Sequence, residues 1–169
     1  MNKLKNWLIP IGLIVLVILP IIAGLVRLLN LSQGGPVNEE NERFFSEPLA
    51  VWVHILASSI FGLLGAVQFS PGFRSHHMVW HRTAGKFLVV AAGFSAISGL
   101  YLTIVFPKLE TDGPTLLYIR LVVGTLMTMS LVLAVRAILT HDFKTHGQWM
   151  TRCYAIGMGA GTQVLTHLP

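Results

Sequence analysis

The sequence predicts an all-α fold: a bundle of five membrane-spanning helices with the amino terminus inside. Three observations support this prediction. The 169 residues are 53% hydrophobic and only 11% charged, the mean hydropathy is +0.68, and five apolar runs approach the length that a bilayer requires. A helix needs roughly 20 apolar residues to cross a bilayer, and soluble domains usually carry about a quarter of their residues as charges. We therefore expect an integral, multi-pass membrane protein.

The predicted helices form a single transmembrane domain and cover about residues 7–29, 48–69, 83–106, 114–139 and 148–168. The first run is too long for a signal-peptide core and no small-residue cleavage site follows it, so we interpret it as a retained helix. The connections are short, apart from a glycine- and acid-rich outer loop, which makes sequence neighbours antiparallel neighbours. The chain stops at Pro169 without a polar tail, which suggests a truncated carboxyl terminus or a natural end further on.

The basic residues give the orientation. Most of them fall at one set of helix ends, which the positive-inside rule places in the cytoplasm: Lys3, Lys5, Arg74, Arg82, Lys86, Arg136, Lys144 and Arg152. Most of the acids fall at the opposite ends. This distribution gives the net charge of +5 a topological meaning, so we expect the lipid bilayer, and no nucleic acid, as the partner.

Polar residues inside the predicted spans form an outer and an inner layer. The outer layer contains His54 and Arg120, and Gln163 and His167 could join it. No acid lies within a span to neutralise Arg120, so its partner would be helix carbonyls, water, an anionic headgroup, a haem propionate or another anionic ligand. Alternatively, Arg120 snorkels to the outer surface and meets lipid phosphate.

The inner layer is denser and contains His76, His77, His81, Arg82, His141, His146, Gln148 and Arg152, with Gln68 at the end of the second helix. His77 and His81 are four residues apart, which would place both imidazoles on one helix face as a candidate metal pair, if the third helix starts that early. The alternative is that such histidines only anchor helix ends to headgroups. We favour that alternative for His76, His77 and His141.

His81 and His146 each begin an apolar helix, and an arginine follows each of them: Arg82 next to His81, and Arg152 after His146. Helices that start on the same side could present these imidazoles to one ligand from opposite faces. Haem b is the candidate ligand, because its iron accepts two histidines and its propionates suit arginines. Anchoring to headgroups remains the alternative.

Other chemistry finds little support. The sequence has no P-loop, no dinucleotide-binding glycine pattern, no H-E-x-x-H and no G-x-S-x-G, and no intramembrane acid that would suit a proton-driven transporter. Small residues at four-residue spacing, such as Ser95 with Gly99 and Gly157 with Gly161, predict close helix packing. The single cysteine, Cys153, cannot form an internal disulfide and is expected to be inert.

The chain resembles an uncharacterised family of multi-pass bacterial membrane proteins, classed as domain of unknown function 2306. The resemblance rests on His54 with Gly65 and Gln68, on His81-Arg82-x-x-Gly85, on Arg120, and on His146-x-x-Trp149-Met150-x-Arg152-x-Tyr154-Ala155. It implies the bacterial inner membrane and a chain that continues past Pro169. It names no reaction.

The pattern is more distantly similar to cytochrome b561-type proteins, which hold two b haems between histidines of alternate helices. That similarity implies His81 and His146 as the inner haem ligands. It implies His54 for the outer haem, but the helix that should supply the partner has Arg120 and no histidine. His167 could substitute, or one haem could bind, or none.

Three functions follow as hypotheses. The first is a haem b redox protein that exchanges electrons with a quinol near His54 and Arg120. The second is a non-catalytic structural or accessory subunit of a larger membrane complex. The third is a metal-binding membrane protein with ligands such as His77 and His81. Whether the chain is an enzyme is left open.

Overall fold

A computed structural model describes residues 3–39, 41–107 and 113–161, and within these ranges the regular structure is entirely helical. The prediction of an all-α fold is therefore confirmed. The helices are α1 (Lys3–Gln33), α2 (Glu42–Ser46), α3 (Pro48–Gln68), α4 (Pro71–His76), α5 (Met78–Val105), α6 (Pro114–Leu139) and α7 (Phe143–Gly161).

The starts of several helices follow from proline chemistry. Pro48, Pro71 and Pro114 each occupy the first helical turn of α3, α4 and α6, where the missing N–H of proline costs nothing. The Ser70 hydroxyl also accepts a hydrogen bond of 3.2 Å from the backbone N–H of Phe73, which caps α4. Short α4 therefore turns the chain from α3 back into α5.

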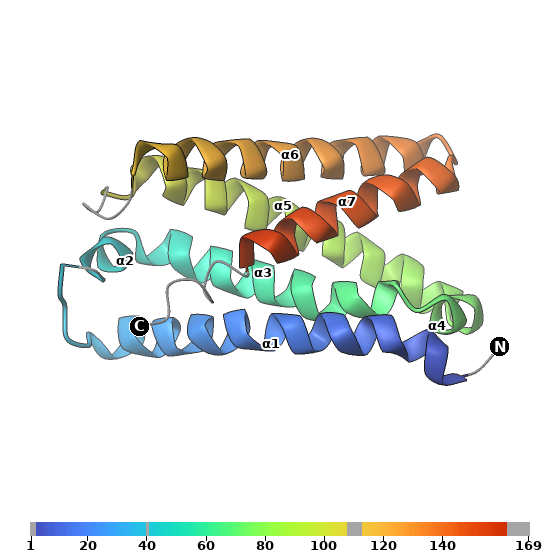
Figure 1. Cartoon of the computed structure of the whole chain (residues 1–169), viewed down its shortest axis with the longest axis horizontal. Coiled ribbons are helices and arrows are strands. Elements are labelled where there is room, and N and C mark those ends of the chain that lie inside the picture. The colour runs from blue at the N-terminus through green and yellow to red at the C-terminus, as the bar shows by residue number, and fades with distance from the viewer. Residues whose placement is uncertain (1–2, 40, 108–112, 162–169) are drawn as a thin grey trace.

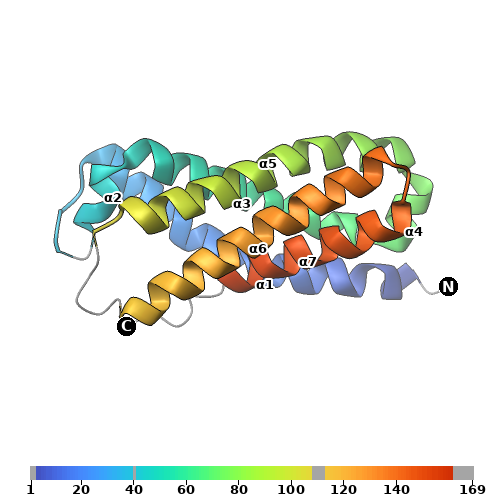
Figure 2. The ribbon, with the colours of Figure 1, turned by 90° about the horizontal axis from the view of Figure 1, so that it is seen from above.

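The long helices form an antiparallel bundle (Figure 1). α1 packs on α3, α3 on α5, α5 on α6 and α6 on α7. One end of the bundle contains the start of α1, helix α4 and the α6–α7 connection; we call it the α4 end. The opposite end contains α2 and the end of α5, and we call it the α2 end (Figures 1 and 2).

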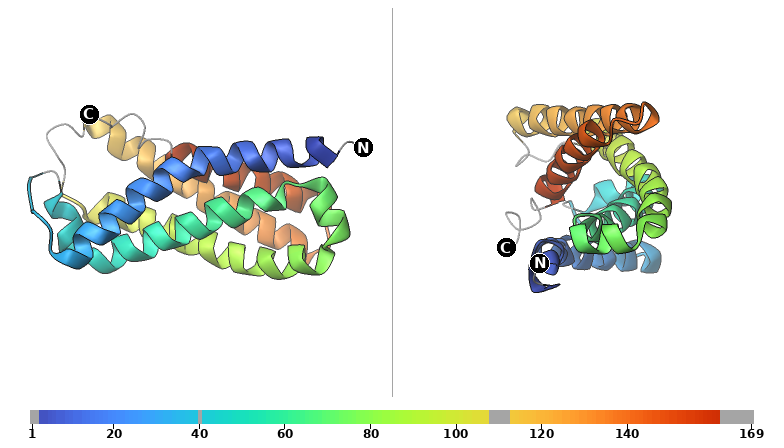
Figure 3. Two further views of the ribbon diagram at one scale, coloured as in Figure 1. Left: turned by 90° about the horizontal axis from the view of Figure 1, so that it is seen from below. Right: turned by 90° about the vertical axis from the view of Figure 1, so that its right-hand side faces the viewer.

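Helix α7 crosses the bundle obliquely. It starts at the α4 end and runs across the gap between α6 and α1, as the end view in Figure 3 shows. The described part of α7 stops near the middle of the bundle (Figure 1). Contacts to α1, α3 and α6 hold it there.

The core is thin and built from small and medium side chains. Ala66, Ala92, Ala134 and Cys153 have no exposed surface, and Leu88 is 2% exposed. Small side chains let helix backbones approach, which is the main source of packing energy where lipid tails are as apolar as the protein interior. Ser95 is also buried, in agreement with the packing role predicted from its spacing.

The outer faces of the bundle are apolar. Leu8, Val15, Phe94, Ile97 and Val122 are all more than half exposed, and many similar residues accompany them on α1, α3, α5 and α6. An apolar surface of this extent would not stay soluble in water, whereas lipid tails cover it without cost. The chain is a multi-pass membrane protein.

Four of the described helices are long and apolar enough to cross a membrane: α1, α3, α5 and α6. α7 does not reach that criterion, because its first half is polar, and the predicted continuation at 162–168 lies outside the described residues. The prediction of five spans is thus not confirmed. α5 and α7 each begin five residues before the predicted positions 83 and 148, so that His81, Arg82 and His146 lie inside helices.

Candidate functional site

The α4 end brings together His81 of α5 and His146 of α7. His81 lies in the first turn of α5, and His146 in the first turn of α7. The charges of Arg74, His146 and Arg82 all act on the His81 imidazole, so these groups are near neighbours. We call His81 and His146 the histidine pair. The structure thus brings the two predicted haem ligands to one place.

The start of α7 is fixed by Asp142. Its carboxylate accepts a hydrogen bond of 3.0 Å from the backbone N–H of Thr145, and its backbone carbonyl accepts one of 2.9 Å from His146. Hydrogen bonds from Thr145 hold the pKa of Asp142 below its usual range. His141, before it, has a φ of 61°, in the left-handed region that ends α6. This turn places His146 against α6.

His146 has a defined orientation. Its Nδ1–H donates a hydrogen bond of 3.0 Å to the backbone carbonyl of Ala134 on α6. Because a carbonyl can only accept, the proton of the neutral ring lies on Nδ1, and Nε2 is left with its lone pair. A ring held in this way is typical of histidines that bind a metal or haem iron through Nε2.

His81 and Gln68 contain buried polar atoms with no hydrogen-bond partner in the described chain. They are Nδ1 of His81 and both amide atoms of Gln68, the last residue of α3. A buried polar group without a partner costs about 1–3 kcal/mol. Groups of this kind in one region indicate a place that a ligand or water completes.

Two arginines lie close to His81, and a third lies further along α7. The Arg152 guanidinium lies 4.5 Å from the centre of the Trp149 ring, a cation–π contact that holds this cation on α7. Arg74 on α4 and Arg82 on α5 add positive charge close to His81. The guanidinium groups of Arg74 and Arg82 close to His81 favour an anionic ligand group.

His77, the other half of the candidate metal pair, directly precedes α5. It caps the start of α5 with non-helical dihedral angles, and its ring stacks on Phe73 at 4.6 Å. The described residues contain no group of three histidine, cysteine or acidic side chains arranged to hold a metal ion. His76 is exposed, and its Nδ1–H donates to the Gly72 carbonyl at 2.7 Å.

Near the α2 end, His54 of α3 packs against α5. Its Nδ1–H donates to the Ser95 carbonyl at 3.0 Å, with the Ser98 hydroxyl 3.1 Å from the same atom. A side chain on Gly99 would stand 3.0 Å from Cε1 of His54, so the glycine makes room for the ring. Nε2 of His54 is again the nitrogen left with a lone pair.

Arg120 lies on α6, two turns from the α2 end. α6 packs mainly on α5 and α7, whereas His54 is on α3. The other predicted members of the outer layer, Gln163 and His167, lie outside the described residues.

The residues that orient the histidines were missed in the sequence. The Ala134 carbonyl orients His146, and the Ser98 hydroxyl lies against His54. Each partner lies on another helix, and no sequence pattern indicates it. Gly99 was assigned to packing from its spacing with Ser95, and the ring that it accommodates is His54. No sequence pattern distinguishes Arg27 and Arg43, which lie near the α2 end.

Comparison with known proteins gives one match. The model of a family described as "Predicted membrane protein (DUF2306)" matches residues 51–169, which include most of α3, all of α4 to α7 and both histidines of the pair. No curated protein and no solved structure matches the chain. The match covers more than two thirds of the sequence, and the chain belongs to the DUF2306 family of predicted membrane proteins.

Proposed function

We propose that the protein is a membrane redox protein that binds haem b through the histidine pair. The observation that supports this most is the convergence of His81 and His146 from two different helices at the α4 end. The similarity in pattern to cytochrome b561-type proteins points to the same two residues.

The imidazoles of His81 and His146 suit haem b. His146 offers Nε2 while its Nδ1–H is held by the Ala134 carbonyl. His81 contributes an imidazole with a buried nitrogen that lacks a partner. Two histidines are common ligands of electron-transferring haem, and a haem held by His81 and His146 would supply one-electron chemistry.

The positive charges near the histidine pair suit the propionates of haem b. Haem b carries two propionates, and Arg74 and Arg82 lie near His81 while Arg152 follows His146 on α7. Guanidinium groups bind carboxylates through paired, charge-assisted hydrogen bonds. No described acid competes for these arginines, since the only described acid at this end, Asp142, is bound to Thr145.

An electron partner that suits the membrane is a quinol. An apolar groove of about 360 Å³ lies between α3 and α5, and its lining includes Val53 and Phe94, the sequence neighbours of His54 and Ser95. The groove suits an isoprenoid tail. His54 follows Val53 on α3 but does not line the groove, and its Nε2 is the proposed acceptor of a proton from a quinol hydroxyl. This part of the proposal is independent of the haem ligands.

The same proposal places the α4 end in the cytoplasm of a bacterium. Arg74, Lys86, Arg136 and Lys144 lie at or near this end, and the positive-inside rule assigns such residues to the cytoplasmic side. The redox protein would then reside in the inner membrane, with its histidine pair near the inner surface.

Haem titration of the full chain in detergent tests the proposal. We expect one haem per chain in the wild type, with loss of binding in His81→Ala and in His146→Ala, and wild-type binding in the control His76→Ala. Equal binding in all four proteins, or none in any, would overturn it.

Two other outcomes would indicate other functions. Retention of metal by the wild type but not by His77→Ala or His81→Ala would indicate a metal site. Stable co-purification with a partner chain would indicate an accessory subunit.

A further inference from the structure

Arg27 is a cation inside a membrane-spanning helix. It lies in the last two turns of α1, and its guanidinium stands 3.9 Å from the centre of the Phe44 ring of α2. It is partly buried, and it makes no hydrogen bond or ion pair with the described residues. An arginine at this depth normally finds a polar partner, because its five N–H groups are expensive to leave unpaired.

A second arginine approaches the same ring. The Arg43 guanidinium lies 5.2 Å from the centre of Phe44 and 5.9 Å from that of Phe106, at the end of α5. Phe44 and Phe106 pack edge to face at 5.4 Å. The charge of Arg43 repels that of Arg27. An anion close to Arg27 would offset this repulsion.

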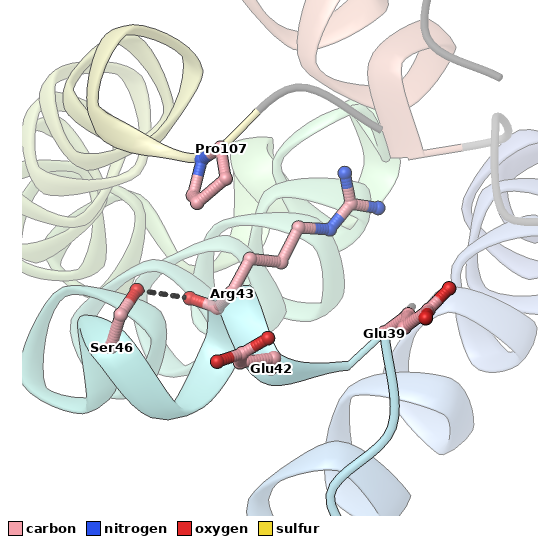
Figure 4. A pocket seen from close by; sticks show the side chains of 5 residues that line it. All are labelled: Glu39, Glu42, Arg43, Ser46 and Pro107. Carbon is pink, nitrogen blue, oxygen red and sulfur yellow. Dashed lines mark hydrogen bonds between the residues drawn. The ribbon is translucent and has the colours of Figure 1, made fainter. Parts of the chain in front are cut away.

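A cavity of about 190 Å³ opens beside these rings. Its lining contains Glu39, Glu42, Arg43, Ser46 and Pro107, and the Arg43 side chain reaches across it (Figure 4). The Ser46 hydroxyl donates to the Arg43 carbonyl at 2.8 Å, which fixes α2. The cavity therefore has acidic and basic walls.

Hydrogen bonds hold Asn38 and Asn41 together just before α2. Asn38 and Asn41 exchange backbone-to-side-chain hydrogen bonds of 2.8 and 2.9 Å, and the Asn41 amide donates to the Pro36 carbonyl at 2.8 Å. Glu47, which precedes α3, accepts from the Tyr101 hydroxyl at 3.1 Å. Glu39 and Glu42 thus supply the negative side of the cavity.

We propose that this place, between α1, α2 and the end of α5, binds the headgroup of a phospholipid of the ethanolamine type. The phosphate lies against Arg27, and the ammonium group faces Glu39 and Glu42. A purely anionic headgroup would meet two carboxylates, and a choline group has no N–H to donate to them. The position of Arg27 within a span favours a lipid over a free phosphate, since the acyl chains can lie along α1.

Native mass spectrometry of the full chain in detergent tests this site. We expect one ethanolamine phospholipid bound per chain, at least tenfold more tightly than glycerol or choline phospholipids with the same acyl chains. Arg27→Gln should abolish this preference, and Glu42→Gln should reduce it. Arg136→Gln, which removes an exposed arginine at the opposite end of α6, should bind as the wild type does. Equal binding of the three lipids by the wild type, or unchanged binding by Arg27→Gln, would overturn the proposal.

Two measurements keep the test independent of folding. Circular dichroism establishes that each variant keeps its helix content. If Arg27→Gln does not fold, Phe44→Leu replaces it, because this change removes the ring that holds both guanidinium groups and leaves every charge in place. A folded Phe44→Leu protein with wild-type lipid preference would also overturn the site. Inorganic phosphate at millimolar concentration should not displace the lipid; displacement would show a simple phosphate site instead.

Discussion

The hydroxyl of Tyr154 on α7 donates a hydrogen bond of 2.7 Å to the backbone carbonyl of Gly62 on α3. The ring of Tyr154 also occupies the place where a side chain at Gly65 would stand, since an added Cβ there would lie 2.5 Å from Cε2. Phe61 and Phe69 enclose the ring. This contact joins α7 to α3 two turns after His146, so it helps to fix the helix that carries His146.

The first prediction concerns this contact. Tyr154→Phe should lower the free energy of unfolding by about 1 kcal/mol, the net value of one hydrogen bond. Gly65→Ala should cost more, roughly 2–3 kcal/mol, because the ring has no room to shift.

The thiol of Cys153 is fully buried and is the only one in the chain, so its reaction with a thiol dye during heating reports unfolding. Gly147→Ala on the same helix is the control, since nothing lies within 4 Å of the added methyl group; a loss as large as that of Gly65→Ala would contradict the packing described.

The second prediction concerns His54 and Gly99. Gly99→Ala places a methyl group 3.0 Å from the His54 ring and should destabilise the protein by about 1–3 kcal/mol. In a His54→Ala background the same change should cost much less, because the ring is gone. A double-mutant cycle measured by thermal unfolding gives the coupling between the two sites. Additive effects would show that the ring does not lie on Gly99.

The third prediction concerns pH and the start of α7. The pKa of Asp142 is below its usual range, so its carboxylate stabilises the turn fully above the unfolded value of about 3.9 and loses this effect as the pH falls through the folded value. Hydrogen exchange of the amides of residues 144–147, corrected for intrinsic rates, should therefore become faster in acid. Asp142→Ala should show fast exchange already at neutral pH. Protection that stays constant down to about pH 3 would contradict this role.

The fourth prediction concerns Gln68. Both atoms of its amide are buried without a partner, so Gln68→Leu should stabilise the ligand-free protein by roughly 1 kcal/mol. Gln68→Glu, of similar size but charged, should destabilise it. Thermal unfolding of both variants in the same detergent provides the comparison. A large loss of stability in Gln68→Leu would mean that the amide already has a partner.

The fold was largely predictable because hydropathy reports directly on a bilayer. Runs such as 48–69 and 114–139 agree closely with α3 and α6. The helix starts at Met78 and Phe143 were placed too late, because the first turns of α5 and α7 are polar and resemble loops. That polarity belongs to the residues of the candidate site.

The candidate site was predictable only in part. His81 and His146 could be paired from the sequence because both begin helices on the same side of the membrane. Their hydrogen-bond partners could not, since a backbone carbonyl such as that of Ala134 carries no sequence signal. Arg27 was passed over because its significance depends on Phe44, which lies on another helix.

The reduced-minus-oxidised optical spectrum of the full chain, purified in detergent after haem supplementation, tests the central claim most directly. The proposed binding by His81 and His146 predicts a Soret band and a sharp alpha band typical of a b-type haem with two histidine ligands. His146→Ala should lose or shift these bands, while His76→Ala keeps them. A spectrum without either band, together with thermal stability that haem does not change, would contradict the claim.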